Sequence, residues 1–146
     1  MHDQLTNLLP MAHAGATWFM VGLIWFVQIV HYPLMRSVPE SAFPGYAVGH
    51  QRRTTWVVGL VMLLEAGSAV LLVLMPEESA GATLAKWIGL GMLALIWAST
   101  FGVQVPLHAK LAVGFDTRVW QRLVATNWLR TIAWTLRGFI ALSLLG

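Results

Sequence analysis

The fold class is decided by residues 54–75, which read TTWVVGLVMLLEAGSAVLLVLM and hold one charged side chain, Glu65. A stretch of about 20 mostly apolar residues is long enough to cross the hydrocarbon core of a bilayer as a helix. Three more stretches of this kind lie at about 11–35, 84–105 and 123–145. The sequence therefore predicts an all-α, polytopic membrane protein whose four transmembrane helices form one bundle.

The composition agrees with a membrane protein, because 58% of the 146 residues are apolar and only 10% are charged. Soluble domains carry about 25% charged residues. Little sequence remains between the four stretches, so we expect a single transmembrane domain over residues 1–146. The first stretch is longer than the apolar region of a signal peptide and has no basic leader, so we expect it to be retained.

Basic residues gather in two of the three links between the predicted helices. The links after the first and third stretches contain Arg36, Arg52, Arg53, Lys110, Arg118 and Arg122. The middle link offers Lys86 against Glu77 and Glu78. Because short links rich in Lys and Arg stay in the cytoplasm, we expect both termini outside the cell and an inner (plasma) membrane location. Anionic lipid headgroups explain the basic links, so we expect the bilayer as a partner and no nucleic acid.

Polar residues lie at the ends of the apolar stretches in two matching sets. His50-x-x-Arg53-Thr54 aligns with Asn127-x-x-Arg130-Thr131 at an offset of 77 residues, and Gln28 and Gln104 fit this offset within one residue. Two repeated helix pairs with links on the same side would be related by an axis along the membrane normal. A chance alignment of four helices of similar length is the alternative.

The rise of a helix, about 1.5 Å per residue, places His31, His50 and His108 at one level near the cytoplasmic edge. Facing helices of a four-helix bundle can build a ligand or metal site in the core. We therefore predict that these histidines are metal ligands or acid–base groups, and ordinary interfacial histidines are the alternative. The chain contains no cysteine, so any metal must have nitrogen or oxygen ligands.

Glu65 lies near the middle of the second predicted helix, where a carboxyl group requires a partner or a function. Arg137 of the fourth helix has a long side chain, so one interpretation is a structural Glu65–Arg137 ion pair. The functional interpretations are a protonated carboxyl in a proton path and a metal ligand beside the histidines. A Glu65 that faces a water-filled cavity is the remaining alternative.

The other candidate catalytic residues are two arginines and an amide near the predicted cytoplasmic edge. Arg53 and Arg130 would hold an anionic or enolate oxygen by charge-assisted hydrogen bonds. Gln28, Gln104 and Asn127 would orient the same molecule.

Two tryptophans lie deeper than the other candidates. Trp25 and Trp97 would wall a flat apolar pocket for a quinone, a porphyrin or a polycyclic molecule, and packing in the core is the alternative.

Two motifs resemble known membrane proteins. The run Asn127-Trp128-Leu129-Arg130-Thr131-x-x-Trp134-x-x-Arg137, with Gln28-x-x-His31-Tyr32-Pro33-Leu34, resembles the small four-helix family that includes anthrone-oxygenase-like proteins. The resemblance spans most of the chain, implies the four-helix fold, and makes Asn127, Arg130 and Arg137 candidate site residues. His13 with Trp18-Phe19 and Gly22-Leu23 is more faintly similar to haem-binding four-helix membrane proteins of the protoporphyrinogen-oxidase and copper-resistance type, which implies haem b.

Three functions are compatible with these observations. The first is a metal- or haem-dependent oxidoreductase or oxygenase-like protein that acts on a lipophilic aromatic or quinone-type molecule, with iron, copper or haem b as cofactor. The second is a haem- or metal-binding electron carrier or sensor. The third is a non-enzymatic membrane module, an assembly subunit or small transporter, with a structural Glu65–Arg137 pair. Each is compatible with a homo-oligomer or a larger membrane complex.

Overall fold

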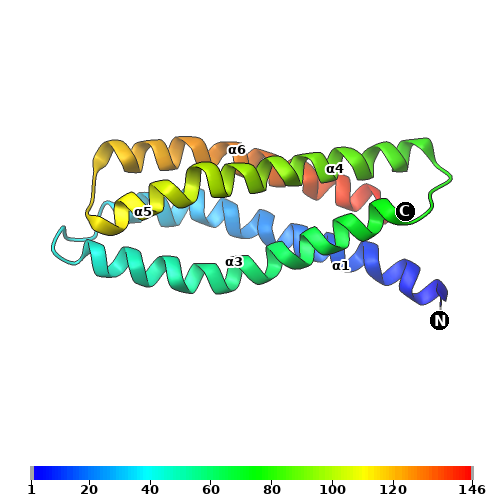
Figure 1. Cartoon of the computed structure of the whole chain (residues 1–146), viewed down its shortest axis with the longest axis horizontal. Coiled ribbons are helices and arrows are strands. Elements are labelled where there is room, and N and C mark those ends of the chain that lie inside the picture. Colours follow the sequence, from blue (N-terminus) through cyan, green and yellow to red (C-terminus); the bar gives the residue numbers. More distant parts are fainter. Residues whose placement is uncertain (1, 146) are drawn as a thin grey trace.

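Each apolar stretch of the sequence becomes one long helical rod, and the rods run antiparallel (Figure 1). The computed structural model describes the backbone of residues 2–145 and the side chains of residues 8–145. In chain order the elements are α1 (His2–Phe26), the π-helix η1 (Val27–His31), α2 (Tyr32–Met35), α3 (Phe43–Leu74), α4 (Ala80–Ser99), the π-helix η2 (Thr100–Gln104), α5 (Val105–Val113) and α6 (Thr117–Ser143). The part of the chain that the structure describes contains no strand, so the predicted all-α fold is confirmed.

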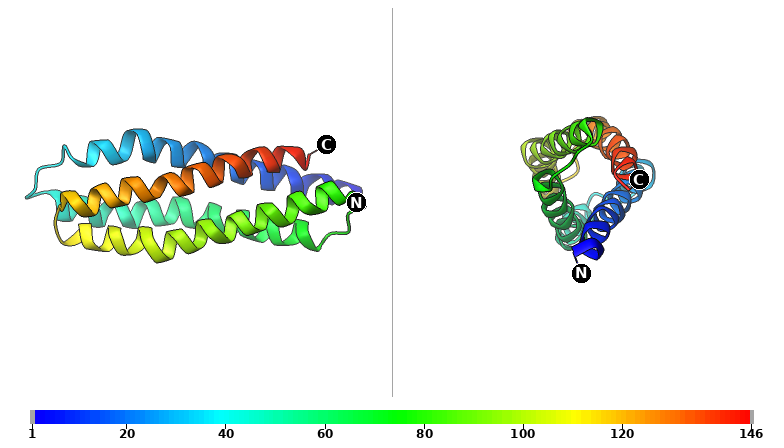
Figure 2. Two further views of the ribbon diagram at one scale, coloured as in Figure 1. Left: turned by 90° about the horizontal axis from the view of Figure 1, so that it is seen from above. Right: turned by 90° about the vertical axis from the view of Figure 1, so that its right-hand side faces the viewer.

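The two ends of the bundle differ in character. The start of α1, the α3–α4 connection and the end of α6 lie at one end, which we call the terminal end (Figure 1). The α2–α3 and α5–α6 connections lie at the other, which we call the basic end because Arg36, Lys110 and Arg118 are there. Both α1 and α4 contact α3 and α6, so the rods form a closed square when viewed along the bundle (Figure 2).

Three of the rods are long and apolar enough to cross a membrane: Leu8–Met35, Phe43–Leu74 and Ala80–Val113. The rod formed by α6 does not reach the same apolarity, since it contains Asn127, Arg130 and Arg137. These three side chains are buried in the bundle, whereas large apolar side chains cover the outer face of α6, among them Leu129, Ile132, Leu136 and Phe139. The inward-facing polar groups therefore lower the average hydropathy of α6 and leave its outer surface apolar.

The helices are longer than the sequence predicts. The second rod begins at Phe43 instead of Thr54, the third ends at Val113 instead of Val105, and the fourth begins at Thr117 instead of Leu123. Pro44 lies in the first turn of α3, where its missing N–H has no helical partner to lose. At the start of α6, Asp116 Oδ1 accepts from the N–H groups of Arg118 and Val119 at 2.7 and 2.9 Å.

A π-helix precedes a proline in both the first and the third rod. The N–H of Tyr32 donates to Val27 O, one residue beyond the α-helical partner, and Pro33 follows. The same arrangement occurs at η2, directly before Pro106. Because proline lacks an N–H and clashes with the preceding turn, a widened turn accommodates it inside a continuous rod. The two π-helices turn Gln28 and Gln104 into the bundle, where both are buried.

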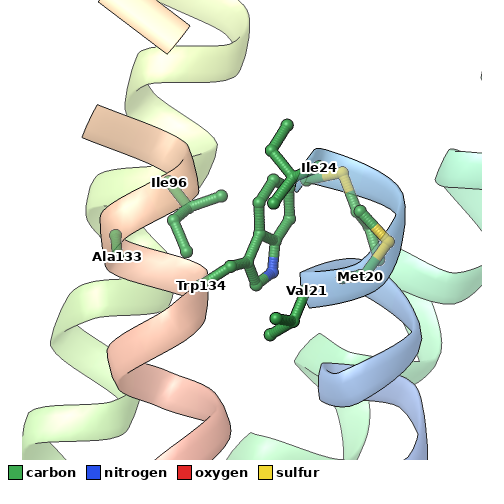
Figure 3. Close-up of a cluster of buried hydrophobic side chains, with 7 residues drawn as sticks. Met20, Val21, Ile24, Ile96, Ala133 and Trp134 are labelled. Atoms are coloured by element: carbon green, nitrogen blue, oxygen red, sulfur yellow. The ribbon is translucent and has the colours of Figure 1, made fainter. Parts of the chain in front are cut away.

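Two apolar clusters fill the interior. The first, which we call the central plug, consists of Met20, Val21, Ile24, Met62, Ile96, Ala133 and Trp134. Figure 3 shows the Trp134 indole extending from α6 toward Met20, Val21 and Ile24 of α1. The second cluster lies at the basic end and consists of Tyr32, Met35, Phe43, Ala47, Leu107, Leu111 and Leu123. The core is therefore dry at the centre, and the polar groups are divided between its two sides.

Candidate functional site

A chain of buried polar side chains joins η1 to α6 on the basic side of the central plug. Asn127 Nδ2 donates to Gln28 Oε1 at 2.8 Å, and Arg130 Nη1 donates to Asn127 Oδ1 at 3.0 Å. Gln28 Nε2 donates to the backbone oxygen of Val124 at 3.3 Å, which fixes the orientation of its amide. Gln28, Asn127 and Arg130, which were all predicted site residues, are thus brought together.

Arg130 has no carboxylate partner among the described side chains. The ion pairs found there are Arg137–Glu65 and Lys86–Glu77. Only 7% of Arg130 is exposed, its Nε has no hydrogen-bond partner, and its guanidinium lies 5.0 Å from the ring centre of Trp134. Burying a charge without a counter-charge is costly. An unpaired buried guanidinium therefore favours a ligand with a negatively charged or strongly polarised oxygen.

Other buried polar atoms on the basic side also lack partners. Gln104 Nε2 donates to Thr126 Oγ1 at 3.0 Å, but Gln104 Oε1 has no hydrogen-bond donor. His31 Nε2 has no hydrogen-bond partner either. Among the described side chains, Thr17 Oγ1 and Trp97 Nε1 share this property. Each buried group without a partner costs about 1–3 kcal/mol. Gln104 Oε1, His31 Nε2 and Arg130 Nε are therefore unsatisfied polar atoms of the basic side.

The three predicted histidines meet at the basic end. The rings of His31 and His50 are stacked with centroids 4.0 Å apart and planes 20° apart, and His108 lies 6.0 Å from His50. Tyr32 Oη lies 3.3 Å from His108 Nε2, and Tyr46 Oη lies 3.5 Å from His31 Nδ1. The histidines and tyrosines thus form one continuous cluster between the first, second and third rods.

The arrangement of these rings does not fit a shared metal ion. The lone pair of an imidazole nitrogen lies in the plane of its ring, so the stacked rings of His31 and His50 cannot both direct a lone pair at one nearby ion. No group of three or more His, Cys, Asp or Glu side chains in residues 8–145 is placed to hold a metal. Hydrogen bonding and proton transfer are the chemistry that the cluster supports in this geometry.

Glu65 lies on the other side of the central plug. Arg137 contacts Glu65 Oε1 through Nη2 at 3.1 Å and through Nε at 3.3 Å, and Trp134 Nε1 donates to Glu65 Oε2 at 3.0 Å. Arg137 Nη1 also donates to the backbone oxygen of Gly89. The predicted Glu65–Arg137 ion pair is therefore confirmed.

The prediction that Glu65 and the histidines bind one metal ion is wrong. Glu65 follows His50 by 15 residues in the continuous helix α3, which is about 22 Å of helical rise. Arg137, a candidate site residue from the resemblance, likewise binds Glu65, away from the histidine cluster.

Three further predicted residues do not enter the site. Arg53 is exposed on α3, whereas Thr54, one residue later, lies 3.2 Å from His50 Nδ1 through its hydroxyl. Trp25 is 39% exposed, and its Nε1 donates to Thr135 Oγ1 across the outer surface of α1 and α6. Trp97 is half-buried and packs on Phe101 with ring centroids 5.6 Å apart. Packing therefore describes the contacts of both tryptophans.

The site includes side chains that the sequence did not single out: Tyr46, Thr54, Thr126 and Trp134. Trp134 is the largest of them. Its N–H binds Glu65, while its ring face lies against Arg130, so it separates the two polar centres and contacts both. The signal was present in the spacing, because Arg130, Trp134 and Arg137 are four and three residues apart and share one face of a helix.

The contacts of the two glutamines do not follow a two-fold repeat. Gln28 of the first rod and Gln104 of the third both bind α6, through Asn127 and Thr126. A repeat of helix pairs would direct Gln104 to the second rod instead.

The chain was compared with known proteins. No protein-family model matches the chain, and neither a curated protein nor a solved structure matches it.

Proposed function

We propose that the basic half of the bundle binds a lipophilic aromatic or quinone-type molecule with an acidic or enolic oxygen, and that Arg130 holds this oxygen. The observation that carries the proposal is the burial of the Arg130 guanidinium without a carboxylate among the described side chains. An amide oxygen and an aromatic face are its contacts, and neither neutralises its charge. A lipophilic anion reaches such a position from the bilayer and supplies the missing charge.

The neighbouring amides hold Arg130 in place. Asn127 uses its oxygen for Arg130 and its nitrogen for Gln28, so the guanidinium is oriented before any ligand arrives. Gln104 Oε1 remains as an acceptor for a second polar group of the ligand. Donors that are oriented in advance in a water-poor site stabilise developing negative charge more than donors in water do.

Proton transfer is the chemistry that we assign to the histidine cluster. The Tyr32–His108 pair links a phenol to an imidazole, and His31 offers an unpartnered Nε2. A group of this kind removes a proton from the ligand oxygen or returns it, while Arg130 stabilises the resulting oxyanion. Oxidoreductase or oxygenase-like turnover of an enolisable aromatic molecule, as the anthrone-oxygenase-like resemblance implies, starts from such a deprotonated substrate.

We further propose that α6 completes a four-span protein in the inner (plasma) membrane, with the basic end in the cytoplasm. The support is the position of Arg36, Lys110 and Arg118 at one end of the bundle and the apolar outer face of α6. In this orientation the Arg130 site lies in the cytoplasmic half of the membrane.

Binding of two matched probes tests the proposal. One is an alkylated hydroxynaphthoquinone, which is acidic, and the other carries a methyl group in place of the hydroxyl. In lipid nanodiscs we expect Arg130→Gln to lower the affinity for the acidic probe by about tenfold to a hundredfold, because a hydrogen bond to a charged group is worth about 1.5–3 kcal/mol. The neutral probe should lose little affinity, and Arg118→Gln, a change at an exposed residue, should affect neither. Equal losses for both probes would refute an anion site.

A non-enzymatic membrane module is the second candidate. The observation that favours it is the complete pairing of Glu65, whose two carboxylate oxygens are bound by Arg137 and Trp134. Such a centre is explained by structure alone.

The predicted cofactors, iron, copper or haem b, have a direct test. Elemental analysis and an absorption spectrum of protein purified without chelator would detect them. If stoichiometric metal is found and is lost in the double variant His31→Ala, His108→Ala, the metal-dependent interpretation is restored.

A further inference from the structure

The terminal end of the bundle is hollow. A hollow of about 1010 Å³, which we call the vestibule, is lined by α1, the end of α3, the start of α4 and the end of α6. A chamber of about 10 Å³ shares Leu72, Ala85, Lys86 and Leu144 with the vestibule. The chamber is lined further by His13 and Arg137, so these ionisable groups lie beside the hollow that adjoins the vestibule.

His13 and Ser68 form a buried hydrogen bond between α1 and α3. Ser68 Oγ lies 2.8 Å from His13 Nδ1, 2.8 Å from Leu64 O and 3.1 Å from Glu65 O. A neutral imidazole has one N–H and one lone pair, and this bond uses Nδ1. The other nitrogen of His13, Nε2, is therefore left for a further partner in either tautomer.

We infer that the vestibule and the chamber form an aqueous half-channel that brings water from the terminal end to His13 and Arg137. A single water needs about 10–15 Å³ and two to four polar partners. The chamber is at the lower limit of that volume, and its lining includes the imidazole of His13 and the guanidinium of Arg137. Both side chains are more than nine-tenths buried, so their contact with water depends on this route.

The central plug ends the half-channel. Met20, Ile24 and Trp134 are at most 4% exposed and close the bundle directly on the basic side of Glu65. Water that enters from the terminal end therefore reaches the Glu65–Arg137 centre and not Arg130. Ionisable residues inside membrane proteins face the bundle interior or a water-filled space. The half-channel is independent of the function proposed for the basic half.

At the mouth of the half-channel, Lys86 Nζ lies 3.1 Å from Glu77 Oε2. The hydrogen bond from Lys86 holds the pKa of the Glu77 carboxyl below its usual value. The side chain of Lys86 is 8% exposed and lines both the vestibule and the chamber, so a charged pair borders the route from bulk water. This polar border distinguishes the mouth from the apolar outer faces of the rods.

Thiol labelling tests the half-channel, because the chain contains no cysteine and each variant adds a single thiol. Leu72 lines both the vestibule and the chamber and is 4% exposed, whereas its neighbour Leu71 is 53% exposed on the outer surface. In nanodiscs we expect a membrane-impermeant, charged methanethiosulfonate, which the vestibule admits, to modify Leu72→Cys at least tenfold faster than Leu71→Cys. The order is opposite to that of static exposure, because a thiol in lipid is poorly ionised and the charged reagent does not enter lipid.

A second pair of cysteine variants keeps the test valid if a variant of the first pair does not fold. Ala85 lines both hollows, and Leu84 beside it faces outward. We expect Ala85→Cys to react faster than Leu84→Cys, with both variants eluting as folded protein. Slow reaction of Leu72→Cys and Ala85→Cys with the charged reagent, together with rapid reaction of both with a lipophilic maleimide, would show a vestibule filled by lipid and would overturn the inference.

Discussion

Two arginines on α6, seven residues apart, are buried to a similar extent but have different partners. Arg137 shares its charge with Glu65, whereas Arg130 contacts an amide and the face of Trp134. A buried charge with a counter-charge is explained by structure. The unpaired charge on Arg130 is what assigns a ligand to the basic half.

The ion pair gives a prediction at the scale of single residues. Arg137→Met should lower the free energy of unfolding by about 3–5 kcal/mol, because it leaves the Glu65 carboxylate buried without a partner. Glu65→Gln in the same protein should recover part of this loss. Denaturation in mild detergent of the wild type, both single variants and the double variant measures the coupling, which we expect to be about 1–3 kcal/mol.

Arg130→Met is the matched control for this cycle. It removes an arginine from the same helix but leaves no carboxylate unpaired, so we expect a smaller loss, at most about 1–3 kcal/mol from the Asn127 oxygen that loses its donor. Additive effects of Glu65→Gln and Arg137→Met would contradict a stabilising pair. A loss in Arg130→Met as large as that in Arg137→Met would show that Arg130 has a structural role.

At this scale the sequence predicted the level of a residue along its helix better than its direction. His31, His50 and His108 meet as the helical rise indicates, but Arg53 points outward while Thr54 points to His50. A shift of one residue turns a side chain by about 100°. The direction depends on how the rods are rotated against each other, which neither hydropathy nor spacing specifies.

Among the elements, α1 and α6 pack tightly against each other at Gly138. A Cβ on Gly138 would lie 3.2 Å from Trp18 Cε2 and 3.3 Å from Val21 Cγ2, and Trp18 Nε1 donates to Gly138 O at 3.1 Å. In membranes, helices associate through such close packing at small residues, because lipid removes the hydrophobic difference between helix and surroundings. Gly138 therefore fixes the α1–α6 contact that positions Gln28 against Asn127.

Gly138→Leu should separate α1 from α6 and lower the midpoint temperature of unfolding. Gly67→Leu is the control, since Gly67 is exposed on α3 and a Cβ there meets nothing within 4 Å. There leucine gains up to about 1 kcal/mol from its better helix propensity, so the control variant should be unchanged or more stable. Thermal unfolding in detergent measures both, and equal midpoints would argue against a tight contact at Gly138.

The existence of the helices followed from apolar runs, but their ends did not. A hydropathy run ends where polar residues begin, whereas the helical backbone of α3 continues through His50, Gln51 and Arg52. Arg52 is exposed, His50 lies beside the Thr54 hydroxyl, and Gln51 Nε2 donates to His108 O at 2.9 Å, so the helix continues without apolar side chains at these positions. The π-helices before Pro33 and Pro106 were also not predicted, because a proline in a helical pattern specifies a distortion and not its form.

Across the whole molecule, the polar groups are divided into two halves by the central plug. The sequence indicated polar groups at two levels, with the histidines near one end and Glu65 deeper. It did not predict the plug or the vestibule, because both depend on which faces of the four rods meet. Trp134 is the contact between the halves, since its N–H binds Glu65 and its ring covers Arg130.

The most direct measurement of the role of Arg130 is an optical titration of the hydroxynaphthoquinone bound in nanodiscs, because its absorbance separates the anion from the acid. A cation beside the bound oxygen favours the anion. We therefore expect the bound probe to lose its proton at lower pH in the wild-type protein than in Arg130→Gln. The same midpoint in both proteins would show that Arg130 does not contact the oxygen, and would contradict a ligand site at this arginine.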